Sequence, residues 1–212
     1  MENLKIFIFY TKNISHFLDL LIESSVGIEN TEFIPVLHDK EYDDCEMGIT
    51  WGSGYLDLCL QSHLTKLEIM KQNKDSNIMF VDVDIVFNNK LNFTDIINNL
   101  LLTNDFLFQY DSNSGMSSSI NLGIIATNCS NNAIKAWQTH CDYISGIPDH
   151  QKRGGFPQLE FNDLISSGRI KPTYQILPQT FGYPQKNSYC YHAIGVTDKI
   201  TSLQTMLNIW NT

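Results

Sequence analysis

The most apolar stretch of the chain, residues 78–87, contains two acidic residues, Asp82 and Asp84. A stretch of this kind predicts a buried strand, and a carboxylate that is buried without a partner is costly. Residues two apart in an extended chain point to the same side, so the two carboxylates are expected to lie together and repel each other. A divalent cation would remove this repulsion by taking both as oxygen ligands. The alternative is that one aspartate ends the strand or caps a turn and the other is solvated.

Apolar runs alternate along the chain with segments of helical spacing. Strands are predicted at 4–10, 31–37, 78–87, 106–110, 120–127 and 173–177, and helices at 14–26, 56–72, 94–102, 130–144, 157–166 and after Thr197. Thr94 and Ser130 are expected as N-caps, a polar loop at 39–54 and a turn at Gly154-Gly155. The alternation predicts an α/β fold with a mainly parallel central sheet flanked by helices. A length of 212 residues suits one domain with a single sizeable core.

The charge of the chain excludes one class of partner. Its formal net charge of −9 argues against a duplex nucleic-acid binder, because neutralising phosphates requires a surface rich in Lys and Arg. A small anionic ligand is compatible with this charge if a cation accompanies it.

The cysteines and the apolar start of the chain indicate where the protein works. The five cysteines are odd in number, scattered and without a CxxC pair, so neither a disulfide framework nor a thiolate zinc site is predicted. The apolar residues 6–9 are far fewer than the about 18 needed to span a bilayer, and they are better explained as the first strand. We expect no membrane segment and a cytoplasmic location, in the host cell if the protein is viral.

Four short motifs follow one another in a fixed order. Residues 80–86 are Phe-Val-Asp-Val-Asp-Ile-Val, residues 120–124 are Ile-Asn-Leu-Gly-Ile, residues 158–162 are Gln-Leu-Glu-Phe-Asn, and residues 191–192 are Tyr-His. They resemble the DxD strand, the N-x-G strand, the D-Q-x-x-F-N helix start and the late histidine of glycosyltransferases with the GT-A fold, in the nucleotide-diphospho-sugar transferase group. The resemblance runs from the first strand to His192. It also extends to the small N-terminal domains of multidomain glycosyltransferases that large algal viruses encode.

The resemblance implies a metal site. A divalent cation would be held by Asp82, Asp84 and His192, with Asp84 and His192 bound directly and Asp82 shared between the cation and the nucleotide ribose. Two carboxylates and one imidazole suit Mn²⁺ or Mg²⁺, and the histidine favours Mn²⁺. The alternative for His192 is a packed, hydrogen-bonded histidine in an aromatic loop.

The resemblance also implies a nucleotide-binding half at about 1–90. Tyr10 and Thr11 close the first predicted strand, where the uracil of a UDP donor is expected; ordinary strand-end packing is the alternative. Lys66 lies on the helix before the DxD strand, away from a leucine stripe formed by Leu60, Leu64 and Leu67. It is expected to contact the nucleotide, and the alternative is a solvated lysine.

The second half, about 91–212, is expected to bind the sugar and the acceptor. Asn121, Gly123 and Gln158 are the candidate sugar-binding residues; the alternative for the first two is a plain strand asparagine and a glycine at a bulge.

The catalytic candidates are Gln158, Glu160 and Asp163, and the stereochemical outcome depends on which of them acts. An inverting enzyme needs a carboxylate base, for which Glu160, Asp163 and Asp111 are conceivable. A retaining enzyme of this fold would set an amide such as Gln158 against the opposite face of the sugar, and the motif match favours retention. The chain departs from the family at Pro157, where an Asp is common, so Glu160 or Asp163 would have to supply that carboxylate.

The expected activity is transfer of a hexose or deoxyhexose from a UDP-sugar to a glycan or glycoprotein, with further domains in a longer protein left open. A sugar-1-phosphate nucleotidyltransferase needs a glycine-rich loop that residues 9–13 lack. A phosphatase of the haloacid dehalogenase type usually carries its DxD in the first strand. A non-catalytic glycan-binding domain of the same fold is the alternative from a different class.

Overall fold

The central feature of the protein is a six-stranded sheet. The computed structural model describes residues 3–38, 53–111, 120–148, 151, 156–194 and 196–212. The sheet has the order β2-β1-β3-β6-β5-β7. Its strands are β1 (Leu4–Tyr10), β2 (Thr31–Leu37), β3 (Ile78–Asp82), β5 (Phe106–Tyr110), β6 (Ile120–Thr127) and β7 (Tyr174–Ile176). Only β6 among these strands runs antiparallel to its neighbours, so the predicted mainly parallel sheet is confirmed.

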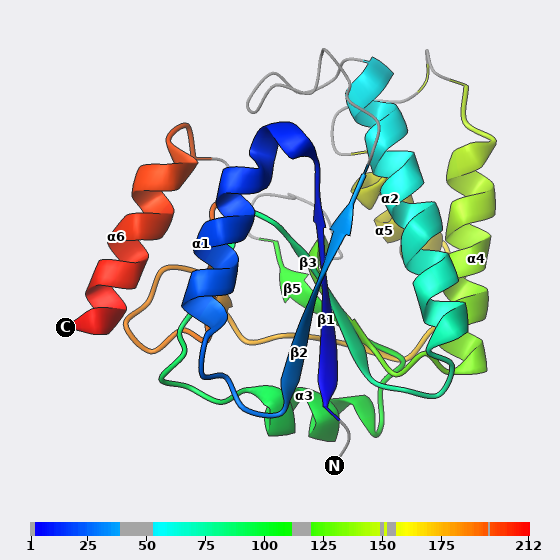
Figure 1. Cartoon of the computed structure of the whole chain (residues 1–212). Coiled ribbons are helices and arrows are strands. Elements are labelled where there is room, and N and C mark those ends of the chain that lie inside the picture. The colour runs from blue at the N-terminus through cyan, green and yellow to red at the C-terminus, as the bar shows by residue number, and fades with distance from the viewer. Residues whose placement is uncertain (1–2, 39–52, 112–119, 149–150, 152–155, 195) are drawn as a thin grey trace.

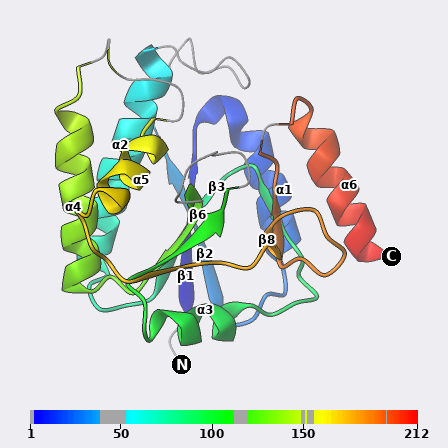
Figure 2. The ribbon, with the colours of Figure 1, turned by 180° about the vertical axis from the view of Figure 1, so that it is seen from behind.

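Helices cover both faces of this sheet (Figures 1 and 2). On one face lie α1 (Ser15–Ser25), which follows the short helix η1 (Lys12–Ile14), and α6 (Lys199–Asn211). On the other lie α2 (Ser53–Gln72), α4 (Asn131–Ser145) and α5 (Gln158–Ser166). The helix α3 (Thr94–Leu101) lies at the end of the sheet where the N-terminus is found (Figure 1).

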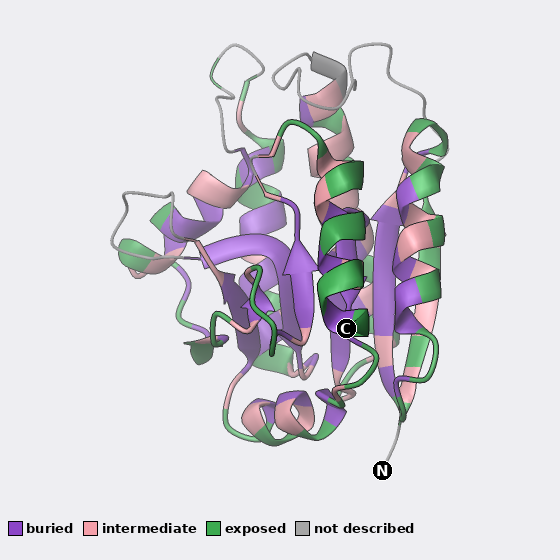
Figure 3. Cartoon of the chain, turned by 90° about the vertical axis from the view of Figure 1, so that its left-hand side faces the viewer, coloured by how far each residue is buried: buried purple, intermediate pink, exposed green. Residues whose placement is uncertain are grey.

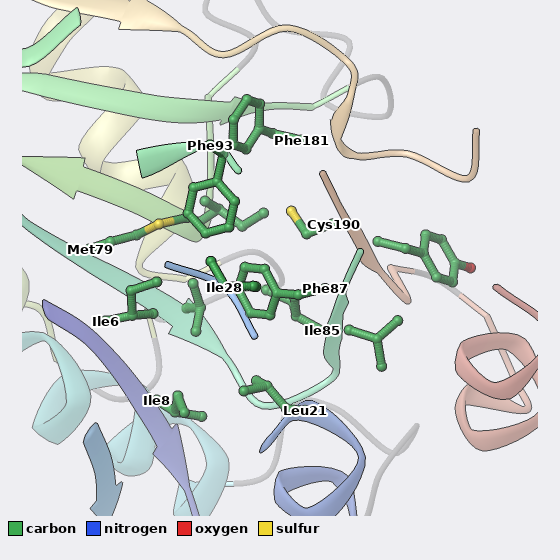
Figure 4. Packing of buried hydrophobic residues seen from close by; sticks show 14 of the residues in the cluster. Ile6, Ile8, Leu21, Ile28, Met79, Ile85, Phe87, Phe93, Phe181 and Cys190 are labelled. Carbon is green, nitrogen blue, oxygen red and sulfur yellow. The ribbon is translucent and has the colours of Figure 1, made fainter. Parts of the chain in front are cut away.

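The period of two along the strands divides the buried residues into two cores. In β1, Ile6 and Ile8 point into the core under α1 and α6, whereas Phe7 and Phe9 point into the core under α2, α4 and α5. Figure 3 shows that the inner strands of the sheet are buried almost throughout, while the helices alternate between buried and exposed residues. The first core includes the stacked rings of Phe87 and Phe93, whose centroids are 5.5 Å apart (Figure 4). A sheet with helices on both faces therefore explains the long apolar runs of the sequence.

The stretch 78–87 is two strands and not the one strand that its apolarity predicts. The chain leaves the central sheet after Asp82, bends at Val83 and Asp84, and continues as β4 (Ile85–Phe87). β4 belongs to a second sheet, of order β4-β9-β8, together with β8 (Phe181–Gly182) and β9 (Cys190–His192). The expectation of a single strand is wrong because the residues of β4 are buried against a different partner, β9, and burial alone does not show which partner a strand pairs with.

The ends of the helices are predicted to within about three residues, with one error of capping. Ser130 is the N-cap of α4, and its hydroxyl accepts a hydrogen bond from the backbone N–H of Ala133. Thr94 is the first residue of α3 and not its N-cap, because its hydroxyl donates to the carbonyl of Glu29. Residues 39–52 of the expected polar loop and the Gly154-Gly155 turn lie outside the described residues, and residues 53–54 already belong to α2.

Two properties of the described residues bear on the sequence-based expectations. None of their helices combines the length and apolarity needed to cross a bilayer. Cys59, Cys129, Cys141 and Cys190 are present as free thiols.

Asp105 ties together three elements at the edge of the central sheet. It precedes β5 and accepts hydrogen bonds from the hydroxyl of Ser130 (2.6 Å), the amide of Asn132 (2.5 Å) and both the backbone N–H (2.8 Å) and the hydroxyl (2.9 Å) of Thr173. Burial alone would raise the pKa of Asp105, but these hydrogen bonds outweigh it and hold the pKa below its usual value. The ionised carboxylate therefore joins the start of β5 to the start of α4 and to the residue before β7.

Replacing this carboxylate should lower stability in a pH-dependent way. Asp105→Asn replaces one accepting oxygen with an NH2 group, a donor that faces other donors, so we expect the free energy of unfolding at pH 7 to fall by about 1.5 to 3 kcal/mol. The pKa of Asp105 is lower in the folded than in the unfolded chain, so its contribution is present above about pH 3.9 and is lost as the pH falls through the folded value. Urea unfolding at pH 7, 5 and 3 should show the two proteins converging in acid. Asp19→Asn, exposed on α1, is the control; a difference that does not depend on pH would contradict the assignment.

Candidate active site

Two aspartates and a histidine meet where β3 leaves the central sheet. Asp82 is the last residue of β3, and Asp84 follows in the bend before β4. His192 ends β9, which pairs with β4 so that His192 lies opposite Ile85. The backbone N–H of Ala193 donates to the carbonyl of Asp84 at 3.0 Å and fixes this register. A slip of one residue in β9 would turn His192 to the other face of the small sheet.

One potential ligand atom of each side chain lies within 4.8 Å of the others. His192 Nε2 is 3.2 Å from Asp84 Oδ1 and 3.8 Å from Asp82 Oδ2. The side chains of His192 and Asp84 are 6% and 11% exposed, but that of Asp82 is 46% exposed, so the cluster is closed on one side and open at Asp82. The two aspartates come together although the strand is interrupted between them, because the bend keeps both carboxylates at the edge of the sheet.

Asp84 is in contact with a lysine as well as with His192. Lys199 Nζ, at the start of α6, donates a hydrogen bond to Asp84 Oδ2. Burial alone would raise the pKa of Asp84, but the attraction of His192 and Lys199 outweighs it and holds the pKa well below its usual range. Asp84 is therefore ionised at neutral pH and is an anionic oxygen donor.

The donor set fits a divalent cation. Carboxylate oxygens are hard ligands that suit Mg²⁺ and Mn²⁺, and one imidazole nitrogen favours Mn²⁺. Within the parts of the chain that the structure describes, Asp82, Asp84 and His192 are the one such group of three acidic, histidine or cysteine side chains. Two carboxylates at this separation repel each other, and a cation between them converts that repulsion into attraction.

The three side chains lie on the wall of a cavity of about 590 Å³, a volume in the range of small-molecule sites. The cavity is bounded by the ends of β1 and β3, by α2, and by the first residues of β6, α5 and α6. Its lining includes all the residues that the sequence assigns to nucleotide, sugar and metal: Tyr10, Thr11, Lys66, Asp82, Asp84, Asn121, Gly123, Gln158 and His192. The structure therefore brings together side chains that are far apart in the sequence.

Lys66 is buried in the cavity wall, so the alternative of a solvated helical lysine is excluded. It is 4% exposed, and its ammonium lies 5.0 Å from the ring centroid of Phe9. Burial lowers the pKa of Lys66, although the nearby carboxylate of Asp82 acts in the opposite direction. The buried side of α2 includes Lys66 and His63 together with Leu67. Leu60 and Leu64 of the expected stripe are half-buried and pack against the hydrophobic cores.

A bulge in β6 shapes the cavity wall beside the candidate metal ligands. Pairing with β5 shifts between Phe108, opposite Ile125, and Gln109, opposite Asn121. Two side chains accept hydrogen bonds from backbone N–H groups in the bulged segment. Gln158 Oε1 accepts from Leu122 at 3.0 Å, and Asn121 Oδ1 accepts from Gly123 at 2.8 Å.

The amide nitrogen of Gln158, one of the predicted sugar-binding residues, also makes a hydrogen bond within the protein. Gln158 Nε2 donates to Asp111 Oδ2 at 2.9 Å, which joins the start of α5 to the end of β5. The amide oxygens of Asn121 and Gln158 thus accept hydrogen bonds from the protein's own backbone. The amide nitrogen of Asn121 makes no hydrogen bond to another described residue.

The three catalytic candidates on α5 differ in position. Gln158 lines the cavity, whereas Glu160 is buried within the protein and Asp163 is exposed on the outer side of α5. Neither Glu160 nor Asp163 is among the described residues that line the cavity.

Sequence reasoning missed Lys199 and Gln109, both of which touch the candidate metal ligands. Gln109 Oε1 lies 2.9 Å from His192 Nδ1. Each had a signal in the sequence. Gln109 interrupts an apolar strand in the same way as the aspartates do, and Lys199 lies in the first turn of a helix, where the helix dipole disfavours a cation.

Known proteins resemble this chain in structure and not in sequence. No protein-family model matches it, and no curated protein matches it in sequence. A glycosyltransferase involved in the glycosylation of the major capsid of PBCV-1 superposes with a TM-score of 0.65 at 14% identity, over 97% of this chain and 99% of that chain. The chain has the GT-A fold.

Two further structures share this GT-A fold. The glycosyltransferase GlyE of Streptococcus pneumoniae TIGR4 has a TM-score of 0.62 at 10% identity, and the match covers 100% of this chain and 63% of GlyE. The galactosyltransferase LgtC, solved with donor and acceptor sugar analogues, has a TM-score of 0.56 at 11% identity over 98% of this chain and 95% of LgtC. Identities this low establish the fold alone.

Burying Lys66 should cost the protein stability. Lys66→Met removes an ammonium that is better solvated in the unfolded chain, so we expect the free energy of unfolding at pH 7 to rise by about 0.5 to 2 kcal/mol. The pKa of Lys66 is lower in the folded chain, so its penalty is complete below the folded value and disappears as the pH rises toward about 10.4. Urea unfolding at pH 7 and pH 10 measures this. The control on the same helix is Lys71→Met, exposed and paired with Glu68; a destabilised Lys66→Met would show that the lysine is held for stability.

Proposed function

We propose that this GT-A domain is a metal-dependent glycosyltransferase that takes a hexose or deoxyhexose from a UDP-sugar. The observation that carries the proposal is the convergence of Asp82, Asp84 and His192 at the carboxyl end of β3, on the wall of a cavity of about 590 Å³. Ligands of open α/β sheets bind at this edge. The three structural neighbours are glycosyltransferases, which supports the proposal from the side of the fold.

The chemistry requires the stabilisation of a leaving diphosphate. A bound cation would supply this stabilisation by neutralising the charge that develops on the phosphate oxygens when the bond between the anomeric carbon and the diphosphate breaks. In this proposal Asp84 and His192 hold the cation from the closed side of the cluster, and the more exposed Asp82 faces the nucleotide. Lys199, which donates a hydrogen bond to Asp84, would add a positive charge beside the diphosphate.

The nucleotide is proposed to lie along the ends of β1 and β3. Tyr10 and Thr11 line the cavity at the end of β1, where the uracil would be held. Lys66, buried beside Phe9 and attracted by Asp82, provides a second positive charge near the diphosphate. The buried ammonium group of Lys66 lowers the stability of the fold, and a bound anion would offset that loss.

The donor sugar is proposed to lie against the bulge of β6. Asn121, Gly123 and Gln158 line the cavity there, and the Asn121 amide nitrogen is oriented by the bond that its oxygen makes to Gly123. Gln158 is the one of the three catalytic candidates on the cavity wall, so we propose it as the group nearest the reacting carbon. The acceptor would be a glycan or a glycoprotein.

The nucleotidyltransferase alternative lacks support at the end of β1. A phosphate loop of that class needs glycines whose backbone N–H groups surround the phosphates. Here β1 is followed by Thr11 and η1, a stretch without glycine.

Binding of UDP should depend on the cation. We expect calorimetry to detect UDP binding to the wild-type protein with Mn²⁺ or Mg²⁺ present and little or none in EDTA. Asp84→Ala removes a ligand of the proposed site, so it should weaken UDP binding in Mn²⁺ by at least about tenfold. Asp19→Asn, a carboxylate exposed on α1, is the matched control. Equal UDP affinity in the wild type and in Asp84→Ala would refute the metal bridge.

The role of Gln158 should appear in turnover and not in nucleotide affinity. Gln158→Glu keeps an acceptor for Leu122 but sets a second carboxylate against Asp111. We expect release of UDP from a panel of UDP-hexoses to slow by about 10- to 100-fold while UDP affinity changes by less than about threefold. Asp163→Asn, exposed on the same helix, should stay within about twofold of the wild type. Loss of turnover in Asp163→Asn instead would move the catalytic role to that carboxylate.

A further inference from the structure

Gln109 is a polar side chain enclosed in the core directly behind His192. It lies in the apolar strand β5 and is 0% exposed. Its oxygen Oε1 lies 2.9 Å from His192 Nδ1, the ring nitrogen that faces away from the aspartates. The contact joins β5 of the central sheet to β9 of the small sheet, over 83 residues of sequence.

This contact determines which nitrogen of His192 carries the proton. An amide oxygen only accepts hydrogen bonds, so His192 Nδ1 must be the donor. Imidazole binds a cation in its neutral form, and a neutral ring protonated at Nδ1 has its lone pair on Nε2, the atom 3.2 Å from Asp84 Oδ1. A proton shared between Nε2 and Asp84 in the cation-free protein would leave when the cation binds. The opposite orientation of the Gln109 amide would put the proton on Nε2 and block a cation there.

Two glycines hold this pair of side chains in place. A Cβ atom at Gly123 would lie 2.2 Å from His192 Cε1, and a Cβ atom at Gly182 would lie 2.1 Å from Gln109 Nε2. Both distances are far below van der Waals contact, so any other residue at these two positions would displace the ring or the amide. Gly182 also has a φ of +110°, which favours glycine. Gly123 therefore packs against the imidazole, in addition to its proposed place on the sugar side of the cavity.

The glutamine is not explained by stability. Its nitrogen Nε2 is fully buried and has no hydrogen-bond partner among the described residues. A buried donor without a partner costs about 1 to 3 kcal/mol, and a methionine of similar shape would avoid that cost. What the glutamine adds over an apolar residue is the acceptor for His192.

We infer that Gln109 is a positioning residue of the metal site, which holds His192 with Nε2 free to bind the cation. This inference rests on the proposed function, because it assigns a role toward the cation of that site. A side chain that accepts a hydrogen bond from the far nitrogen of a metal-binding histidine orients the ring, and its loss costs about 10- to 100-fold in metal affinity.

The test is the affinity for Mn²⁺ in the presence of UDP, measured by calorimetry, beside the thermal midpoint of unfolding. Gln109→Met removes the acceptor and the buried unpartnered donor together. We expect it to weaken Mn²⁺ binding by about 10- to 100-fold without lowering the thermal midpoint. Gln109→Glu keeps an acceptor for Nδ1 and should restore most of the affinity. Gln109→Asn moves the acceptor away from Nδ1 by one methylene and should also weaken Mn²⁺ binding. It replaces the methionine variant in the test if that variant does not fold.

Thr127→Val is the matched control for replacing a buried polar side chain. Thr127 is the last residue of β6 and is 0% exposed, and its hydroxyl accepts a hydrogen bond from the backbone N–H of Cys129. We expect the reverse pattern, a lower thermal midpoint with unchanged Mn²⁺ affinity. NMR of the ¹⁵N-labelled, Mg²⁺- and UDP-loaded wild type should show a slowly exchanging proton on His192 Nδ1, shifted downfield by its hydrogen bond, and Gln109→Met should lose that shift.

The outcomes separate this inference from the proposed function. No cation-dependent UDP binding in the wild type would overturn both. Normal binding in the wild type with equal Mn²⁺ affinity in Gln109→Met, or a His192 ring without a proton on Nδ1, would overturn the role of Gln109 and leave the proposed function standing.

Discussion

The repulsion between Asp82 and Asp84 is the constraint on which the rest of the site depends. Two carboxylates at the end of a buried strand are stable only if positive charge or hydrogen-bond donors lie beside them. In this protein His192 and Lys199 contact Asp84, and Lys66 is close enough to attract Asp82. These residues come from β9, α6 and α2, so the fold brings compensating charge to one point from three separate elements. A cation and a nucleotide diphosphate would complete this balance of charge in the proposed enzyme.

The second sheet brings His192 to the two aspartates. β4 leaves the central sheet directly after the aspartates and pairs with β9, and the register of that pairing delivers His192 to them. The hydrogen bond to Gln109 and the close packing of Gly123 and Gly182 fix the position of the imidazole. The bulge in β6, whose Gly123 packs against the same imidazole, is held by Asn121 and Gln158. Several polar residues that look like ligand contacts in the sequence thus also support the backbone or another side chain of the site.

Much of the fold follows from local patterns. Apolar runs and helical spacing predict the strands of the central sheet and the helices α1 to α6, because the inner strands are apolar throughout and the helices carry one apolar side. They miss β8 and β9, which are too short to show a pattern. The same reasoning fails for residues 78–87, where one apolar run supplies strands to two sheets. It also misses that Lys66 and His63 belong to the buried side of α2, since both lie off the stripe of leucines that apolarity indicates. Both failures occur at the cavity, where polar groups replace the residues that packing alone would favour.

The sequence by itself determined the α/β class, the order of the elements and the identity of the acidic pair, because periodicity and the cost of a buried carboxylate are local properties. It also pointed to His192, through the resemblance of short motifs. Only the tertiary structure decided that His192 faces the aspartates, that Lys199 joins them, that Gln109 supports the imidazole, and that Gln158 and not Glu160 or Asp163 reaches the cavity. The physical reason is that these contacts depend on strand register and on the packing of helices across the sheet, and residues up to 115 positions apart in sequence meet only after the chain has folded.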